Sequence, residues 1–162
     1  VRRPDAAMFS GYWNRPEATA AKFTGDWLRT GDTGTMDADG YITFRGRTDD
    51  LINAAGYRIG PSEVEDCLLR HPAVAMAAVV GAPDPTRGEV VAAFIVPRAG
   101  AEGDPGLPAS IRDFVRSRLA AHAYPRIVRI VDALPLTATG KVMRRTLRDR
   151  LREDEEPVVR NN

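Results

Sequence analysis

The segment Pro135-Leu-Thr-Ala-Thr-Gly-Lys141 contains the residue types that bind phosphate groups. Its threonines and glycine favour a flexible turn rich in hydroxyl groups, and Lys141 places an ammonium group at the expected start of a helix. A Walker A loop requires Gly-x-x-x-x-Gly-Lys followed by Ser or Thr, whose hydroxyl binds Mg²⁺. Here Pro135 stands at the first glycine and Val142 follows the lysine, so that hydroxyl is missing. Lys141 therefore suits a negative charge that develops during a reaction.

Three more side chains have the chemistry of a nucleotide site. Asp32 follows a Thr-Gly pair, and a carboxylate there can accept hydrogen bonds from two neighbouring ribose hydroxyls. Arg47 and Arg58 flank a short loop, and arginine often contacts phosphate through two parallel hydrogen bonds. Each has a plainer interpretation. Asp32 could cap a turn, and either arginine could form a surface ion pair with Asp49 or Asp50.

Gly56 lies in the same loop, at the end of Ala54-Ala-Gly56. A glycine at this point allows the backbone to approach a ligand closely or to adopt a positive φ angle. A purely structural turn glycine is the alternative interpretation.

Length and composition indicate an ordinary globular chain of about one domain. The 162 residues are 43% hydrophobic and 28% charged, and the net charge of +1 does not favour a nucleic-acid partner. The longest apolar run, residues 73–82, is far shorter than the ~20 residues of a membrane helix, so no membrane span is expected. The single Cys67 excludes an internal disulfide and indicates a reducing compartment. With only two histidines besides, we expect no metal site.

The chain begins with Val-Arg-Arg-Pro and carries no leader typical of a signal peptide. We therefore expect a cytoplasmic protein, and we expect this chain to be a piece of a longer one.

Turn signals and hydrophobic spacing divide the chain into three parts. Residues 1–48 are predicted to be the β-rich end of a larger, truncated domain, with a hairpin turn at Asp39-Gly40 and a short helix over 16–23. Residues 49–152 are predicted to be a small domain, and residues 153–162 a charged tail. The expected fold class is α+β, a short antiparallel sheet flanked by helices and preceded by the β-rich remnant.

The small domain is expected to contain three helices and five short strands, the latter at 51–53, 57–59, 74–80, 90–96 and 127–131. A capping-box pattern, Ser62-x-x-Glu65, predicts the start of the first helix. The apolar residues expected to face the core from the three helices are Val64, Cys67 and Leu68; Ile111, Phe114, Val115 and Leu119; and Met143, Leu147 and Leu151. Five arginines of the last helix are interpreted as its solvated face, balanced by acidic residues at 153–156: Arg144, Arg145, Arg148, Arg150 and Arg152.

Three stretches occur in a distinctive order: Trp27-Leu-Arg-Thr-Gly-Asp32, then Gly40-Tyr-Ile-Thr-Phe-Arg-Gly-Arg-Thr-Asp-Asp-Leu-Ile-Asn-Ala-Ala-Gly-Tyr-Arg-Ile-Gly-Pro-Ser-Glu-Val-Glu65, then the Pro135–Lys141 segment. Together they resemble the C-terminal portion of the adenylate-forming superfamily, which includes acyl-CoA synthetases, adenylation domains of peptide synthetases, and luciferases. The resemblance covers residues from about 8 to 151, and it is strongest to the acetyl- to medium-chain branch of the acyl-CoA synthetases.

This resemblance implies a ligase reaction in two halves. A carboxylate attacks the α-phosphate of ATP to give an acyl-adenylate and pyrophosphate, and the thiol of CoA then displaces AMP. ATP, with Mg²⁺, would be bound mainly by a large N-terminal domain that this chain lacks. The small domain, residues 49–152, would be a mobile lid that rotates about a hinge between the two half-reactions.

The resemblance also implies roles for single residues. Lys141 would be the catalytic residue, because its charge offsets the repulsion between the carboxylate and the triphosphate. Asp49 would be the hinge, and no metal ligand is implied. The positions that match nucleotide- or CoA-binding residues are Asp32 and Arg47 near the ribose, Arg58 near the phosphates, and Gly56 in a loop that lines the pantetheine tunnel. The sequence departs from the common pattern at Asn53, where many members have lysine, and at Leu136-Thr137, where a basic residue is frequent.

The expected partners follow from the same resemblance. They are the protein's own N-terminal domain, a carboxylic acid, ATP, CoA, and a lysine acyltransferase that would remove the charge of Lys141. Alone, the chain is expected to be inactive. Two alternatives stay open: an adenylation domain that loads a carrier protein, and a stand-alone, non-catalytic binding module.

Overall fold

The structure, a computed structural model, describes residues 2–155, which form two compact units. The first unit ends at Asp49 and the second begins at Asp50, and a 3₁₀ turn, η1 (Thr48–Asp50), carries the chain from one to the other. The roles predicted for the parts of the chain on either side of this point stay predictions.

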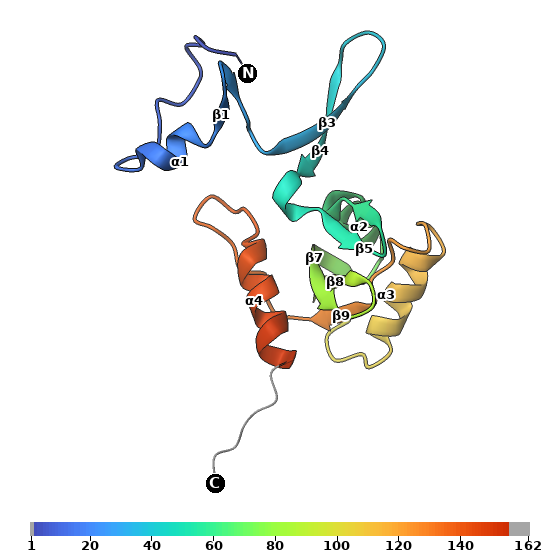
Figure 1. Cartoon of the computed structure of the whole chain (residues 1–162). Helices are drawn as coiled ribbons and strands as arrows, with labels where there is room; N and C mark the ends of the chain where they lie inside the picture. Colours follow the sequence, from blue (N-terminus) through green and yellow to red (C-terminus); the bar gives the residue numbers. More distant parts are fainter. Residues whose placement is uncertain (1, 156–162) are drawn as a thin grey trace. The chain divides into compact units, whose positions relative to one another are not determined.

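The first unit consists of one short helix and two hairpins, shown in blue to cyan in Figure 1. The hairpin predicted at Asp39-Gly40 is confirmed: β3 and β4 pair in antiparallel fashion, and Gly40 has a φ of +86°. The elements are α1 (Pro16–Ala20), β1 (Phe23–Thr24), β2 (Trp27–Leu28), β3 (Asp32–Met36) and β4 (Ile42–Arg47).

The first unit has almost no core of its own. Among residues 2–49, Gly46 alone is buried. The long β3–β4 hairpin leaves Tyr41 74% exposed and Ile42 76% exposed, and Trp13, which follows the start of the chain, is 90% exposed. Since burial of apolar side chains is the main force that stabilises a fold, these residues lack a covering surface within the described part of the chain.

The second unit is a sheet with helices on both faces. Strand β8 is at its centre, with β7 antiparallel along one side; on the other side β5 pairs with its start and β9 with its middle. The elements are β5 (Ile52–Ala54), β6 (Tyr57–Ile59), α2 (Pro61–Leu68), β7 (Val74–Asp84), β8 (Gly88–Pro97), α3 (Leu107–Arg116), β9 (Ile127–Ile130) and α4 (Arg144–Glu155). The predicted α+β class is confirmed.

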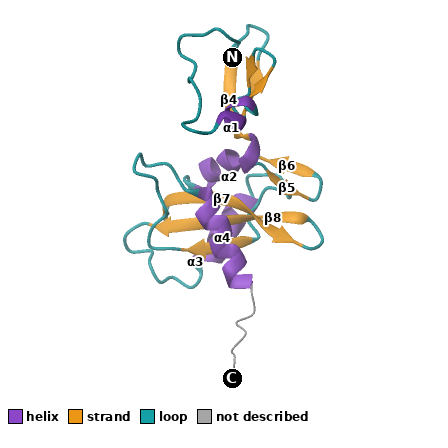
Figure 2. Cartoon of the chain, turned by 60° about the vertical axis from the view of Figure 1, so that its left-hand side comes forward, coloured by secondary structure: helices purple, strands orange, loops and turns teal. Residues whose placement is uncertain are grey.

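Alternate residues of β8 face two separate apolar clusters. Val91, Ala93 and Ile95 pack with the buried side chains of α2 and α3 on one face. Val90, Ala92 and Phe94 pack on the other face, where α4 contributes Leu147 and Leu151. The strand is therefore apolar from Val90 to Val96, as expected for a strand covered on both faces. Figures 1 and 2 show α3 and α4 on opposite sides of the sheet.

Several sequence-based expectations for the second unit are corrected. Strand β9 runs parallel to β8, because α3 carries the chain back across the sheet between them. Met143 is 43% exposed and precedes α4, so the apolar ladder of that helix begins at Leu147. The capping box is absent: Gly60 is the N-cap of α2 without a side-chain cap, and Glu65 points elsewhere. Leu119 lies beyond the end of α3.

Candidate functional site

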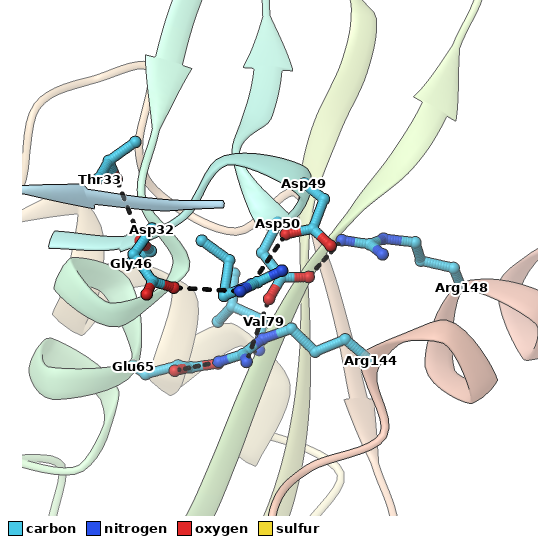
Figure 3. Close-up of polar contacts among 10 residues, drawn as sticks. Asp32, Thr33, Gly46, Asp49, Asp50, Glu65, Val79, Arg144 and Arg148 are labelled. Atoms are coloured by element: carbon cyan, nitrogen blue, oxygen red, sulfur yellow. Dashed lines mark hydrogen bonds and ion pairs between the residues drawn. The ribbon is translucent and has the colours of Figure 1, made fainter. Parts of the chain in front are cut away.

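Three of the predicted site residues meet in the first unit. Arg47, the last residue of β4, donates a hydrogen bond from Nη1 to Oδ1 of Asp32 at 3.1 Å and from Nε to Oδ1 of Asp49 at 3.1 Å. The pairing of β3 with β4 sets Asp32 opposite Arg47, so the hairpin itself positions these two residues. Figure 3 labels the two carboxylates that Arg47 contacts, those of Asp32 and Asp49. The ion pair between Arg47 and Asp49 is also the plainer interpretation that the sequence suggested.

The electrostatics of this cluster keep the guanidinium charged. The hydrogen bond to Asp49 is the largest influence and raises the pKa of Arg47, and Asp32 adds to it. Nη1 also donates to the carbonyl oxygen of Thr30 at 2.9 Å. Arg47 therefore holds one carboxylate on each side, and it orients Asp32 at the edge of the hairpin.

Gly56 and Arg58 lie on the β5–β6 hairpin of the second unit. Gly56 has a φ of +84° and Ala55 a φ of 50°, so both central residues of the turn are left-handed, as the tight hairpin turn requires. A Cβ at Gly56 would meet no atom within 4 Å, so the backbone angle, and not a lack of space, favours glycine. Arg58 is exposed and forms no ion pair with another residue in the range 2–155.

A cavity of about 250 Å³ opens beside the Ala55–Gly56 turn. Arg87 and Arg126 are among its lining residues, and two further lining residues, Tyr57 and His122, stack with their ring centres 3.9 Å apart and their planes 4° apart. Tyr124 lines this cavity as well.

Backbone contacts hold the two arginines of the cavity in place. The main-chain N–H of Arg126 donates to the carbonyl of Val91 at 2.9 Å, next to the start of β9. Asp84 accepts main-chain hydrogen bonds from Arg87 at 2.8 Å and Thr86 at 3.0 Å, and these bonds lower the pKa of its carboxyl group, Arg87 having the larger effect. The Asp84 carboxylate thus closes the β7–β8 turn that presents Arg87.

Lys141 lies on a closed turn and not at the first residue of a helix. The main-chain N–H of Thr137 donates to the carbonyl of Lys141 at 2.8 Å, and the N–H of Lys141 donates to Oγ1 of Thr137 at 3.0 Å. Gly140 turns the chain with a φ of +79°. Helix α4 begins three residues later, at Arg144, so the expectation of a lysine at a helix start is corrected.

A cluster of four charged residues, here called the ion network, lies in the second unit: Asp50, Glu65, Arg144 and Arg148. Arg144 Nη2 contacts both carboxylate oxygens of Glu65 at 2.9 Å, and its Nη1 lies 3.5 Å from Oδ2 of Asp50. Arg148 Nη2 lies 2.9 Å from Oδ1 of Asp50. Figure 3 shows the two carboxylates directed at the two guanidiniums.

The ion network corrects the interpretation of the arginines of α4. Arg144 and Arg148 are only 24% and 26% exposed at their side chains, so they are not on a solvated face, whereas Arg145 is 93% exposed, as expected. The signal that could have indicated this is the position of Arg144 itself. A cation in the first turn of a helix is unfavourable unless an acidic group lies nearby.

The structure thus brings together Asp32, Arg47 and Asp49, and it places Gly56 and Lys141 on separate turns of the second unit. No cluster of three or more acidic, histidine or cysteine side chains that could hold a metal ion occurs in residues 2–155. Within the same residues, no helix has the length and apolar character needed to cross a membrane.

Comparison with known proteins shows the family to which this chain belongs. Residues 63–141 match the family described as the AMP-binding enzyme C-terminal domain. The chain belongs to this adenylate-forming family and corresponds to the C-terminal portion of its members.

The relatives that the chain matches include acyl-CoA and acetyl-CoA synthetases. The chain is 52% identical over 144 residues to human mitochondrial acyl-coenzyme A synthetase ACSM1, covering 88% of this chain and 25% of the relative. It is 48% identical over 149 residues to the acetyl-coenzyme A synthetase of Bacillus subtilis, covering 91% and 26%. The crystal structure of ATP-bound MatB from Rhodopseudomonas palustris superposes with a TM-score of 0.81 at 34% identity, over 91% of this chain and 29% of that one. The chain spans about a quarter of the length of the curated relatives that it matches.

Proposed function

We propose that this chain is the C-terminal part of an ATP-dependent acyl-CoA synthetase, in which it supplies the catalytic lysine, the hinge and part of the CoA site. The carboxylate oxygen of an acid attacks the α-phosphorus of ATP, and the bond to pyrophosphate breaks. The sulfur of CoA then attacks the acyl carbonyl, and AMP leaves. The observation that carries the proposal is the cavity beside the Ala55–Gly56 turn, because two guanidiniums and a stacked aromatic pair suit the phosphates and adenine of CoA.

Lys141 acts in the first half-reaction. Charge builds up on the α-phosphate oxygens as the carboxylate approaches, and a fixed ammonium group lowers the energy of that state. The turn fixes the main chain of Lys141 through Thr137 and leaves the residue exposed, so the side chain is available to a substrate. The same exposure makes Lys141 accessible to the proposed lysine acyltransferase.

Asp32 and Arg47 act on the ribose of the nucleotide. Arg47 occupies only Oδ1 of the Asp32 carboxylate, and Asp32 Oδ2 accepts no hydrogen bond within residues 2–155. A carboxylate held in this way can accept a hydrogen bond from a ribose hydroxyl. Arg58, exposed and without an acidic partner in the same residues, is the proposed contact to the nucleotide phosphates. The Mg²⁺ that accompanies ATP is proposed to lie mainly with the large domain.

Asp49 is the proposed hinge. It is the last residue of the first unit, and the 3₁₀ turn that contains it connects the two units. Hinges are typically a few residues at the ends of elements, where a change in backbone angles moves a whole domain. On this proposal residues up to 48 are the end of the large domain, and residues from 49 to 152 are the lid.

The exposed apolar residues of the first unit support the proposal that a further domain covers them in the intact protein. Trp13, Tyr41 and Ile42 are at least 74% exposed, and the relatives are about four times as long as this chain. We propose that the protein's own N-terminal domain covers them. The chain alone would therefore have no acyl pocket and no activity.

The test uses the intact enzyme and this 162-residue chain side by side. The intact enzyme should catalyse ATP–pyrophosphate exchange that depends on a carboxylic acid and should form thioester with free CoA, whereas the chain alone should do neither. Exchange by the chain alone would contradict its proposed dependence on the large domain. Exchange without thioester formation from free CoA would contradict the synthetase assignment and indicate a carrier protein as the acceptor. A cytoplasmic location stays a prediction, since the human relative is named as mitochondrial.

A further inference from the structure

Helix α4 starts in an electrostatically unfavourable way. Its first turn contains Arg144 and Arg145 and no acidic residue, and the positive end of the helix dipole repels cations. Arg145 is 93% exposed, so water screens its charge, but Arg144 is only 24% exposed. The start of the helix around Arg144 therefore depends on negative charge brought from elsewhere in the fold.

Two distant carboxylates supply that charge. Glu65 of α2 binds Arg144 through both oxygens, and Asp50, the first residue of the second unit, binds Arg144 and Arg148. Glu65 is itself anchored, because its Oε1 accepts the main-chain N–H of Val79 at 2.8 Å. The start of α4 is thus attached to the sheet, to α2 and to the residue that follows the proposed hinge.

The ion network adds little to the free energy of unfolding for the number of charged groups that it buries. Arg144 Nε is buried and has no hydrogen-bond partner within residues 2–155. Buried ion pairs can often be replaced by apolar side chains with little loss of stability, because desolvation offsets much of their attraction. Their directional, two-oxygen geometry is better suited to fixing a position.

The position that Arg144 fixes is that of the Lys141 turn. Only Val142 and Met143 separate Lys141 from Arg144. Val142 pairs with Leu136, and the N–H of Met143 donates to the carbonyl of Pro135 at 2.8 Å, so the turn continues directly into the helix as one hydrogen-bonded piece. Movement of the start of α4 would therefore move the whole turn.

We infer that Arg144 is a positioning residue that, through Glu65 and Asp50, fixes the Lys141 turn relative to the lid side of the hinge for adenylation. The inference rests on the proposed function of Lys141. It does not require Arg144 to touch a substrate, and its effect should be limited to the half-reaction that uses Lys141.

The test compares Arg144→Gln with Arg145→Gln in the intact enzyme. The two variants lose the same charge at neighbouring positions, but only Arg144 belongs to the ion network. Because misplacement of a reacting group by about 1 Å can cost ~10²-fold, Arg144→Gln should slow pyrophosphate exchange roughly 10- to 100-fold. Thioester formation from supplied acyl-adenylate should change less than twofold or so. Arg145→Gln should leave both rates near the wild-type values.

A double variant shows whether Arg144 acts through Lys141. If it does, Lys141→Ala with Arg144→Gln should be no slower in exchange than Lys141→Ala alone. Additive losses, or equal losses of both half-reactions in Arg144→Gln, would overturn the inference. Arg144→Lys, which keeps the charge but not the planar fork, should restore part of the rate. If Lys141→Ala itself slows both half-reactions equally, the proposed function fails, and that result is separate from the Arg144 comparison.

Discussion

Arg144 Nη2 lies 2.9 Å from both carboxylate oxygens of Glu65, a residue 79 positions earlier in the chain. This contact joins the first turn of α4 to the middle of α2, and the side chain of Glu65 is only 15% exposed. It also explains why Glu65 does not cap its own helix, since both of its oxygens are directed at Arg144 and one also accepts the N–H of Val79.

Replacement of Glu65 should therefore destabilise the chain. Glu65→Ala removes the two-oxygen contact to a largely buried guanidinium, which then keeps only Asp50 at 3.5 Å, and leaves the main-chain N–H of Val79 without its acceptor. This loss should cost about 3 kcal/mol of the free energy of unfolding. Glu63→Ala, on the exposed side of the same helix, should change it by less than about 0.5 kcal/mol. Chemical denaturation of the two variants measures both values, and an equally small loss in Glu65→Ala and Glu63→Ala would contradict the importance of Glu65 as an acceptor.

Local patterns predicted most of the fold. The alternation of turn residues with short apolar runs located the strands from β5 to β9, and Asp39-Gly40 located the β3–β4 hairpin. Helical spacing identified Leu147 and Leu151 as buried. These features depend on residues close together in the sequence, and that is why they could be read without the structure.

The ion network and the cavity could not be predicted in this way. Asp50 and Arg148 are 98 positions apart, and neither shows a local sign of its partner. The cavity combines Tyr57, Arg87 and Arg126 from three separate turns or strand ends. The capping-box pattern at Ser62 and Glu65 was misleading, because the same Ser-x-x-Glu spacing occurs when the glutamate contacts residues of other elements, here Val79 and Arg144.

Lys141→Ala in the intact enzyme should separate the two half-reactions. Loss of a single stabilising charge typically costs ~10²–10³ in rate, so pyrophosphate exchange should fall by about that factor. Thioester formation from supplied acyl-adenylate should be largely spared, because in that step a thiol attacks the acyl carbonyl and no carboxylate has to approach a triphosphate. Lys141→Arg keeps the charge with a different shape, so its rate of pyrophosphate exchange should fall between those of the wild type and Lys141→Ala. An equal decrease in both half-reactions would contradict the assigned role.

The cavity beside Gly56 should control the affinity for CoA. Arg87→Gln and Arg126→Gln each remove one guanidinium, and the KM for CoA should rise roughly 10-fold for each, as expected for a lost charged hydrogen bond of about 1.5 kcal/mol. The rate of pyrophosphate exchange should be unchanged. Dephospho-CoA, which lacks the 3′-phosphate, distinguishes the two contacts. Replacement of an arginine that binds this phosphate should raise the KM for CoA but not the KM for dephospho-CoA. An unchanged KM for CoA in both variants would exclude this cavity as part of the CoA site.

His71 should make the stability of the second unit depend on pH. Its side chain is 6% exposed, Nδ1 accepts the N–H of Ala73 at 3.2 Å, and Nε2 lies 3.2 Å from Oγ of Ser110, an arrangement that suits the neutral ring. Burial and, to a lesser extent, the charge of Arg118 lower the pKa of His71 below 6.5. The unfolded chain therefore binds the proton first. The free energy of unfolding should be constant above pH ~6.5 with respect to this group and should decrease as the pH falls below it, until the folded-state pKa is passed.

Denaturation of the 162-residue chain between pH 7.5 and 5, on a scale set by the ordinary histidine pKa of about 6.5, measures the slope of the free energy of unfolding against pH. It should disappear in His71→Gln but persist in His122→Gln, which changes the exposed histidine, and a slope that survives in His71→Gln would assign the dependence to another group.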